Sequence, residues 1–162
     1  MYAVAETPLI DSSANDQARS DRDEEWLRRE LEFIWETYFG DVERLNAVEI
    51  RFGRPWKARL GMITLSASGR TTYIGVNSLL HSRLVPNFIP RVTIAHELVH
   101  YSHGFGSPLP KKCSHPHRGG VVAKELADRG LDDEHRYYQQ WLHDNWLLFY
   151  GRCRYGLKLM GQ

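Results

Sequence analysis

Apolar side chains recur at every third or fourth position between Asp23 and Gly40, and charged residues fill the gaps between them. This spacing predicts an amphipathic helix that buries one face and ends at Gly40, because glycine is common just after a last helical turn. Residues 1–20 show no such periodicity, so we expect a flexible tail there and a single domain over residues 21–162. The apolar positions of the predicted helix are Trp26, Leu27, Leu31, Ile34, Trp35, Tyr38 and Phe39.

Three short segments after this helix have the pattern of β-strands. Residues 48–52 alternate apolar and charged side chains, which is typical of a half-buried strand, and residues 58–65 and 71–76 are expected to form two further strands. Serines and a glycine between the last two segments predict a hairpin loop over residues 66–70. We therefore expect a small antiparallel sheet of three strands.

The rest of the chain has a helical pattern. Pro90 suits the first position of a helix, where its missing N–H is not needed, and we expect that helix to run over residues 90–103. Further helices are expected over about 116–130 and 132–150, the last of them rich in aromatic residues. The predicted fold class is α+β, with the small sheet packed against the N-terminal helix, the central helix and the C-terminal helices.

The central predicted helix carries the sequence His96-Glu97-Leu98-Val99-His100, an H-E-x-x-H motif. Residues four apart lie about 40° apart around a helix axis, so both imidazoles can reach one metal ion. Glu97 lies beside that metal rather than on it, where it can take a proton from an activated water and pass it to a leaving amine. Zinc suits such a site because it accepts imidazole nitrogen and keeps one position open. The motif predicts a catalytic zinc centre.

A catalytic zinc needs a third protein ligand, and the sequence offers three candidates. The first choice is His117, because it lies at the expected start of the next helix. His115 is the second choice, and Glu125, which would complete a His-His-Glu site, is the third. A straight helix seldom brings three of its own side chains onto one metal, so His103 is expected to line the site without binding.

The net charge of +1 conceals an uneven distribution along the chain. Residues 1–50 contain 5 basic and 13 acidic side chains, whereas residues 51–120 contain 10 basic side chains and a single acid, Glu97. A basic segment that also holds aromatic residues can bind single-stranded nucleic acid by stacking, so nucleic acid is a candidate partner of segment 51–120. The competing interpretation is that these cations pair with the acidic N-terminal helix. The aromatic residues concerned are Phe52, Trp56 and Tyr73.

Cysteine content and hydropathy exclude some classes of protein. Two cysteines, Cys113 and Cys153, are too few for a disulfide-framed secreted scaffold. No apolar run approaches the 18 or so residues of a membrane helix, and the N-terminus lacks the features of a signal peptide. We expect a cytoplasmic protein with no membrane association; the sequence is silent on its oligomeric state.

Several of these segments together resemble the SprT-like zinc metallopeptidase domain of the Spartan-related family. The resemblance rests on residues 35–39 of the first helix, on Tyr73–Asn77 at the end of the sheet, on the H-E-x-x-H motif and on a later histidine that opens a helix. It implies a zincin-like fold and a zinc peptidase with Glu97 as acid/base and His96, His100 and His117 as ligands. Many relatives also carry a C-terminal zinc ribbon of four cysteines, which we do not expect here because Cys153 stands alone in that region.

The leading functional hypothesis is a zinc-dependent peptidase that acts on a protein or peptide substrate. The alternative is a non-catalytic, metal-stabilised module that binds nucleic acid or protein through its basic segment. A metal-dependent hydrolase of non-peptide amides is a third class, because the motif reports activation of water and says nothing about the substrate.

Overall fold

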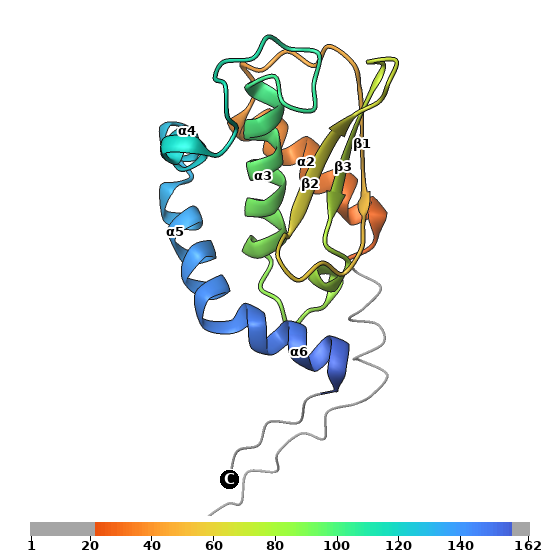
Figure 1. Ribbon diagram of the computed structural model, residues 1–162, viewed down its shortest axis with the longest axis vertical. Coiled ribbons are helices and arrows are strands. Elements are labelled where there is room, and N and C mark those ends of the chain that lie inside the picture. The colour runs from red at the N-terminus through yellow and green to blue at the C-terminus, as the bar shows by residue number, and fades with distance from the viewer. Residues whose placement is uncertain (1–21, 157–162) are drawn as a thin grey trace, which may run out of the picture.

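The computed structural model describes residues 22–156, and the tail expected over residues 1–20 lies outside them. The fold is α+β, with one small open sheet and helices that pack on one of its faces (Figure 1). Helix α3 (Phe88–Ser102) lies at the centre, between the sheet and the helices that follow it in sequence. Among the described residues, none of the helices has the length and apolar character needed to cross a membrane, and the cytoplasmic location stays a prediction.

The sheet has the strand order β1-β3-β2 and is mixed. Strand β3 (Thr71–Val76) pairs in parallel with β1 (Ala47–Phe52) and antiparallel with β2 (Gly61–Leu65). The prediction of an entirely antiparallel sheet was wrong at the β1–β3 pair, whereas the hairpin between β2 and β3 is confirmed. The alternation of side chains tells which face of a strand is buried but not the direction of its neighbour.

The connection between β1 and β2 explains the difference in topology. The connection is too long for a tight hairpin, so β1 and β2 need not be neighbours. In the sheet, β3 lies between them. Asn77, just after β3, organises this connection: its buried side chain donates hydrogen bonds to the carbonyl oxygens of Trp56 (2.7 Å) and Arg59 (2.9 Å). Residues 58–60, which the sequence pattern assigned to a strand, are consequently loop.

Helix α2 (Glu24–Tyr38) confirms the first predicted helix. Asp23 caps it, since its side chain accepts a hydrogen bond from the backbone N–H of Trp26 at 2.8 Å. Helix α3 begins two residues before Pro90, so the prediction that Pro90 occupies the first helical position was wrong. The first four N–H groups of a helix have no partner within the helix, and proline is therefore tolerated throughout this turn.

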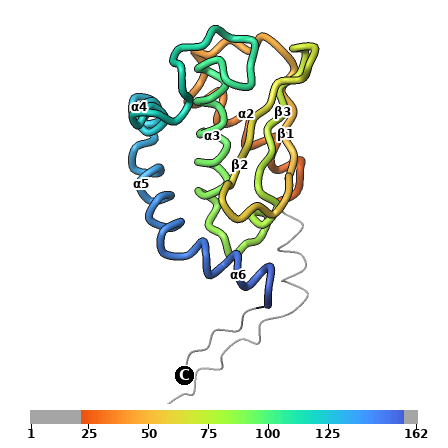
Figure 2. The backbone as a smooth tube through the Cα atoms, in the orientation of Figure 1, coloured from red at the N-terminus to blue at the C-terminus, as the bar shows by residue number. Residues whose placement is uncertain are grey.

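The C-terminal part of the described chain forms a helical arm that begins on the other side of α3 from the sheet and ends below α3 in the view of Figures 1 and 2. A short 3₁₀ turn, η2 (Arg118–Gly120), leads into α4 (Val121–Asp128). The arm continues through α5 (Asp132–Trp141), the π-helical turn η3 (Leu142–Trp146) and α6 (Leu147–Tyr155), so the last helical stretch extends beyond its predicted end at residue 150. The Trp146 indole N–H donates to the carbonyl oxygen of Lys57 at 2.7 Å and ties the arm to the β1–β2 connection.

Arg22 is a buried cation that fastens the start of α2 to the approach to α3. Its guanidinium donates to the carbonyl oxygens of Leu80 and Ser82, each at 2.9 Å, and of Val85 at 2.7 Å. These carbonyls belong to the turn η1 (Ser78–His81) and to the loop that follows it. A planar fork with five donors satisfies several buried acceptors at once, which a lysine could not do. The loop that leads into α3 is thereby held against the N-terminal helix.

Candidate metal centre and cleft

The H-E-x-x-H motif lies on helix α3, as the sequence predicts, in the C-terminal half of that helix. Nearly every residue of this helix is buried, and His96 and His100 project from one face by the four-residue spacing of the motif. Their Nε2 atoms are 3.0 Å apart and their ring planes are nearly perpendicular. The two nitrogens thus point at a common position next to the helix.

His117 joins this pair from the loop that precedes η2. Its ring centroid lies 4.5 Å from that of His100 and 5.6 Å from that of His96. One ring nitrogen from each of the three histidines lies within 4.8 Å of the others. Two nitrogens bound to a tetrahedral zinc ion at about 2.05 Å lie about 3.3 Å apart. The three imidazoles are therefore close enough to hold one metal ion together.

The three imidazoles open into a cleft of about 770 Å³. Strand β2 forms one wall through residues 61–64, and Tyr138 and Leu142 of the helical arm form another. Phe105 and Gly106, from the loop after α3, also line the cleft. Because β2 is an edge strand, one of its hydrogen-bonding edges is not paired with another strand of the sheet.

Glu97 lies in the same cleft and is only 5 % exposed. Burial raises the pKa of its carboxyl group to about 8, and the nearby charge of Arg59 opposes this shift. The carboxylate packs against strand β2: a Cβ added at Gly61 would lie 2.5 Å from Oε1 of Glu97. Gly61 therefore leaves the space that the Glu97 side chain occupies.

The two histidines of α3 are held in their neutral form. Burial, together with the neighbouring His117, lowers the pKa of His96 to about 4. Burial and the charges of His96 and His117 lower the pKa of His100 to about 3. Metal ions bind the neutral imidazole, so both side chains are in the ligand form at neutral pH.

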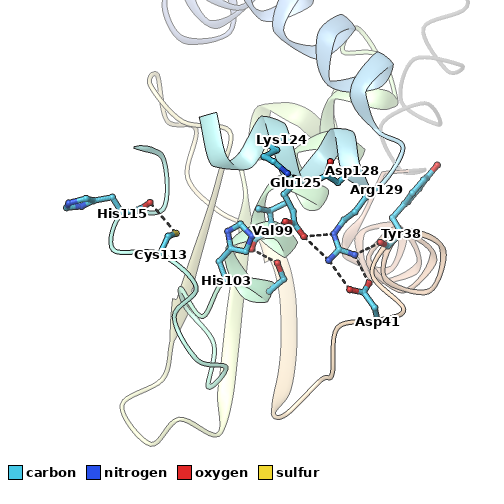
Figure 3. Close-up of polar contacts among 11 residues, drawn as sticks. Tyr38, Asp41, Val99, His103, Cys113, His115, Lys124, Glu125, Asp128 and Arg129 are labelled. Atoms are coloured by element: carbon cyan, nitrogen blue, oxygen red, sulfur yellow. Dashed lines mark hydrogen bonds and ion pairs between the residues drawn. The ribbon is translucent and has the colours of Figure 1, made fainter. Parts of the chain in front are cut away.

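The other two candidates for the third ligand are not part of the cluster of three histidines. His115 is exposed, and its carbonyl oxygen is 3.4 Å from the Cys113 sulfur. The Glu125 carboxylate instead contacts His103 and Arg129 (Figure 3). The expectation that His103 lines the site was wrong: its ring is buried beneath the end of α3, where it contacts Glu125.

Two residues of the cleft were not singled out by the sequence. Gly61 looked like any other strand glycine, and Tyr138 looked like a core aromatic. Tyr138 is 9 % exposed, lines the cleft and has its hydroxyl 3.4 Å from that of Thr93. Burial raises its pKa to about 12, so it remains a phenol at neutral pH. Neither position carries a local signal, because its importance arises from contacts across the fold.

A second hollow, of about 650 Å³, lies on the face of the sheet opposite the helices. We call it the outer groove; it combines Arg51, Arg54 and Arg59 with the aromatic rings of Trp56 and Tyr73. The Arg51 guanidinium lies 5.5 Å from the centre of the Tyr73 ring, and that of Arg59 lies 5.9 Å from Trp56. The competing interpretation, in which the basic segment pairs with the acidic N-terminal helix, applies to Arg91: its guanidinium donates two hydrogen bonds to Glu30 of α2.

In comparisons with known proteins, no family model, curated protein or solved structure matches the chain. The assignment of the cluster therefore rests on its own chemistry and geometry.

The choice of third ligand can be tested by comparing two neighbouring histidines. We expect His117→Ala to weaken zinc binding by more than about a hundredfold, since loss of even an outer-shell partner costs up to that much. His115→Ala, two residues away and exposed, should bind zinc as the wild type does. Competition against a chromogenic zinc chelator measures both affinities. Equal effects of the two substitutions would contradict the assignment of His117.

The pKa of Glu97 predicts a pH dependence of the metal-free protein. A carboxyl group with a pKa of about 8 when folded and an ordinary pKa when unfolded stabilises the fold most at low pH, and this contribution is lost as the pH rises toward 8. In a chelator, between pH 6.5 and 8, we expect Glu97 to lower the free energy of unfolding by up to about 1.4 kcal/mol per pH unit. This slope is taken as the difference between the wild type and Glu97→Gln, because the lowered pKa values of His96 and His100 act in the opposite direction in both proteins. Urea unfolding curves measure both proteins, and equal slopes would refute the shift.

Proposed function

We propose that this protein is a zinc-dependent metallopeptidase, and that it is related to the SprT-like zinc metallopeptidases with their zincin-like fold. The observation that carries the proposal is the convergence of three imidazoles and one buried carboxyl group at the floor of a single cleft. A structural zinc site is typically closed by four protein ligands, whereas three histidines leave a position for water or substrate. A carboxyl group beside that position is what hydrolysis requires.

The shape of the cleft favours a peptide over a small amide as substrate. Strand β2 lines the cleft and is at the edge of the sheet. An extended peptide can add to such an edge through main-chain hydrogen bonds, independently of its side chains. The scissile bond of a peptide held along β2 would pass in front of His96, His100 and Glu97. A small non-peptide amide has no extended main chain and could not form this series of hydrogen bonds with β2.

Each group in the cleft has a role in the proposed hydrolysis. A bound zinc ion supplies Lewis acidity, which lowers the pKa of water and polarises a carbonyl group. The Glu97 carboxylate accepts the proton of the attacking water and later donates it to the leaving amine. Burial favours the protonated form of this carboxyl group in the metal-free protein. The charge of a bound zinc ion would oppose that shift and favour the carboxylate that accepts the proton. Gly61 supports both steps by leaving room for the carboxylate.

The alternative function, a module that binds nucleic acid, is favoured by one specific observation, the outer groove. Trp56 lies over the sheet there, since a Cβ at Gly53 would lie 2.5 Å from its ring and one at Gly75 would lie 3.4 Å from it. Exposed rings next to arginines offer stacking surfaces for bases and charges for phosphates. This function is compatible with peptidase activity, since the groove and the cleft lie on different sides of strand β2 and share Arg59, Met62 and Thr64.

The catalytic role of Glu97 separates an enzyme from a binding module. We expect Glu97→Gln to lower the rate of cleavage of a dye-labelled casein by about a hundredfold to ten-thousandfold, which is the usual contribution of a general acid–base group. Zinc content, measured on the same preparation, should be unchanged because Glu97 is not a ligand. A wild-type protein that binds zinc but has no activity above this variant would favour the non-catalytic module.

The outer groove makes a separate prediction about nucleic acid. We expect Tyr73→Ala to weaken binding of a fluorescein-labelled oligothymidylate about five- to a hundredfold, because stacking of a base on a ring contributes about 1–3 kcal/mol. Phe33→Ala is the matched control, since Phe33 is an exposed aromatic residue on α2, which packs on the other face of the sheet. Fluorescence anisotropy at low salt measures both. Equal affinities for the two variants would exclude the groove as the binding surface.

A further inference from the structure

His117, the third histidine of the cluster, lies in a segment that makes few packing contacts of its own. His117 is exposed and precedes two glycines, Gly119 and Gly120, that both adopt left-handed backbone conformations with φ of 69° and 67°. A Cβ added at either glycine would meet no atom within 4 Å, so nothing packs on this link. The position of His117 therefore depends on where helix α4, which follows directly, is held.

Helix α4 is short, and two kinds of contact hold it against α3. Val122 and Leu126 are buried in the core. Between them in sequence, Glu125 accepts a hydrogen bond from the buried ring of His103, with 3.2 Å between Oε2 and Nε2 (Figure 3). His103 caps the C-terminus of α3, three residues after His100. The contact thus joins the helix that carries two histidines of the cluster to the helix that follows the third.

Arg129 extends this contact to the N-terminal part of the chain. Its Nε donates to Oε1 of Glu125 at 3.0 Å, and its Nη1 donates to the Tyr38 carbonyl oxygen at 2.7 Å and to Oδ1 of Asp41 at 2.6 Å. The guanidinium also lies 4.3 Å from the centre of the Phe39 ring. We call the set His103, Glu125, Arg129 and Asp41 the Glu125 clamp.

The clamp is better suited to orientation than to stability. A buried ion pair often contributes no more to the free energy of unfolding than apolar side chains of the same volume would. Hydrogen bonds are directional, however, and a guanidinium that grips two carboxylates has one preferred geometry. Apolar contacts are not directional and do not by themselves select one rotation of a two-turn helix on α3, whereas the hydrogen bonds of the clamp favour one rotation.

We propose that Glu125 is a positioning residue for the third metal ligand: through the clamp it holds α4, and with it His117, where the imidazole meets those of His96 and His100. This inference rests on the proposed metal site. The sequence made Glu125 a candidate metal ligand. In this proposal it does not bind the metal itself but holds the backbone that connects α4 to His117.

The test compares zinc affinities by competition with a chromogenic chelator. Glu125→Ala should weaken zinc binding by roughly ten- to a hundredfold, the usual effect of losing a group that orients a ligand. The matched control is Asp128→Asn on the same helix, because Asp128 forms an exposed pair with Lys124. We expect this variant to bind zinc as the wild type does. Asp41→Asn, at the exposed end of the clamp, should fold normally and weaken zinc binding by a smaller factor.

A double substitution separates positioning from general damage. In a His117→Ala background, Glu125→Ala should cause no further loss of zinc affinity, because its effect passes through His117. An equal loss in both backgrounds would overturn the inference, as would wild-type affinity in Glu125→Ala.

If Glu125→Ala does not fold, Asp41→Asn is tested in the same two backgrounds and decides in the same way. A wild-type protein that does not bind zinc would overturn the proposed function and this inference together. Weakened binding in His117→Ala combined with wild-type affinity in Glu125→Ala would overturn only the inference.

Discussion

The burial of helix α3 is the constraint on which the rest of the structure depends. This helix contacts α2, two strands of the sheet, α4 and α5, yet it carries two histidines and a glutamate in its C-terminal half. Polar groups in such a position are costly unless they have partners or access to a cleft. The surrounding elements provide both: Gly61 makes room for the Glu97 carboxylate, and His117 approaches from outside the helix to complete a cluster of three imidazoles.

Strand β2 connects the two hollows of the molecule. Its position at the edge of the sheet leaves a main-chain edge free, and the cleft lies along it. The outer groove begins on the other side of the same strand, where Arg59 belongs to the lining of both. Arg59 is also one of the charges that act on Glu97. A ligand in the groove and a peptide in the cleft would therefore contact the same five-residue strand.

Much of the secondary structure could be predicted from periodicity, because a helix or strand with one buried face repeats its apolar residues at a fixed interval. Helix α2 follows this rule almost to the residue. Prediction failed where contacts between distant segments decide the outcome. The parallel pairing of β1 with β3 depends on a connection that is organised by Asn77, and the extension of α3 before Pro90 depends on a loop that is held by Arg22.

The sequence by itself determined the pair of histidines and the glutamate between them, since residues one and four positions apart on a helix have a geometry that is set locally. It also narrowed the third ligand to three candidates. Only the tertiary structure placed His117 with the pair, turned Glu125 toward His103 and Arg129, and brought Tyr138 and β2 to the cleft. These are contacts between segments far apart in sequence, and no local pattern encodes the packing that brings them together.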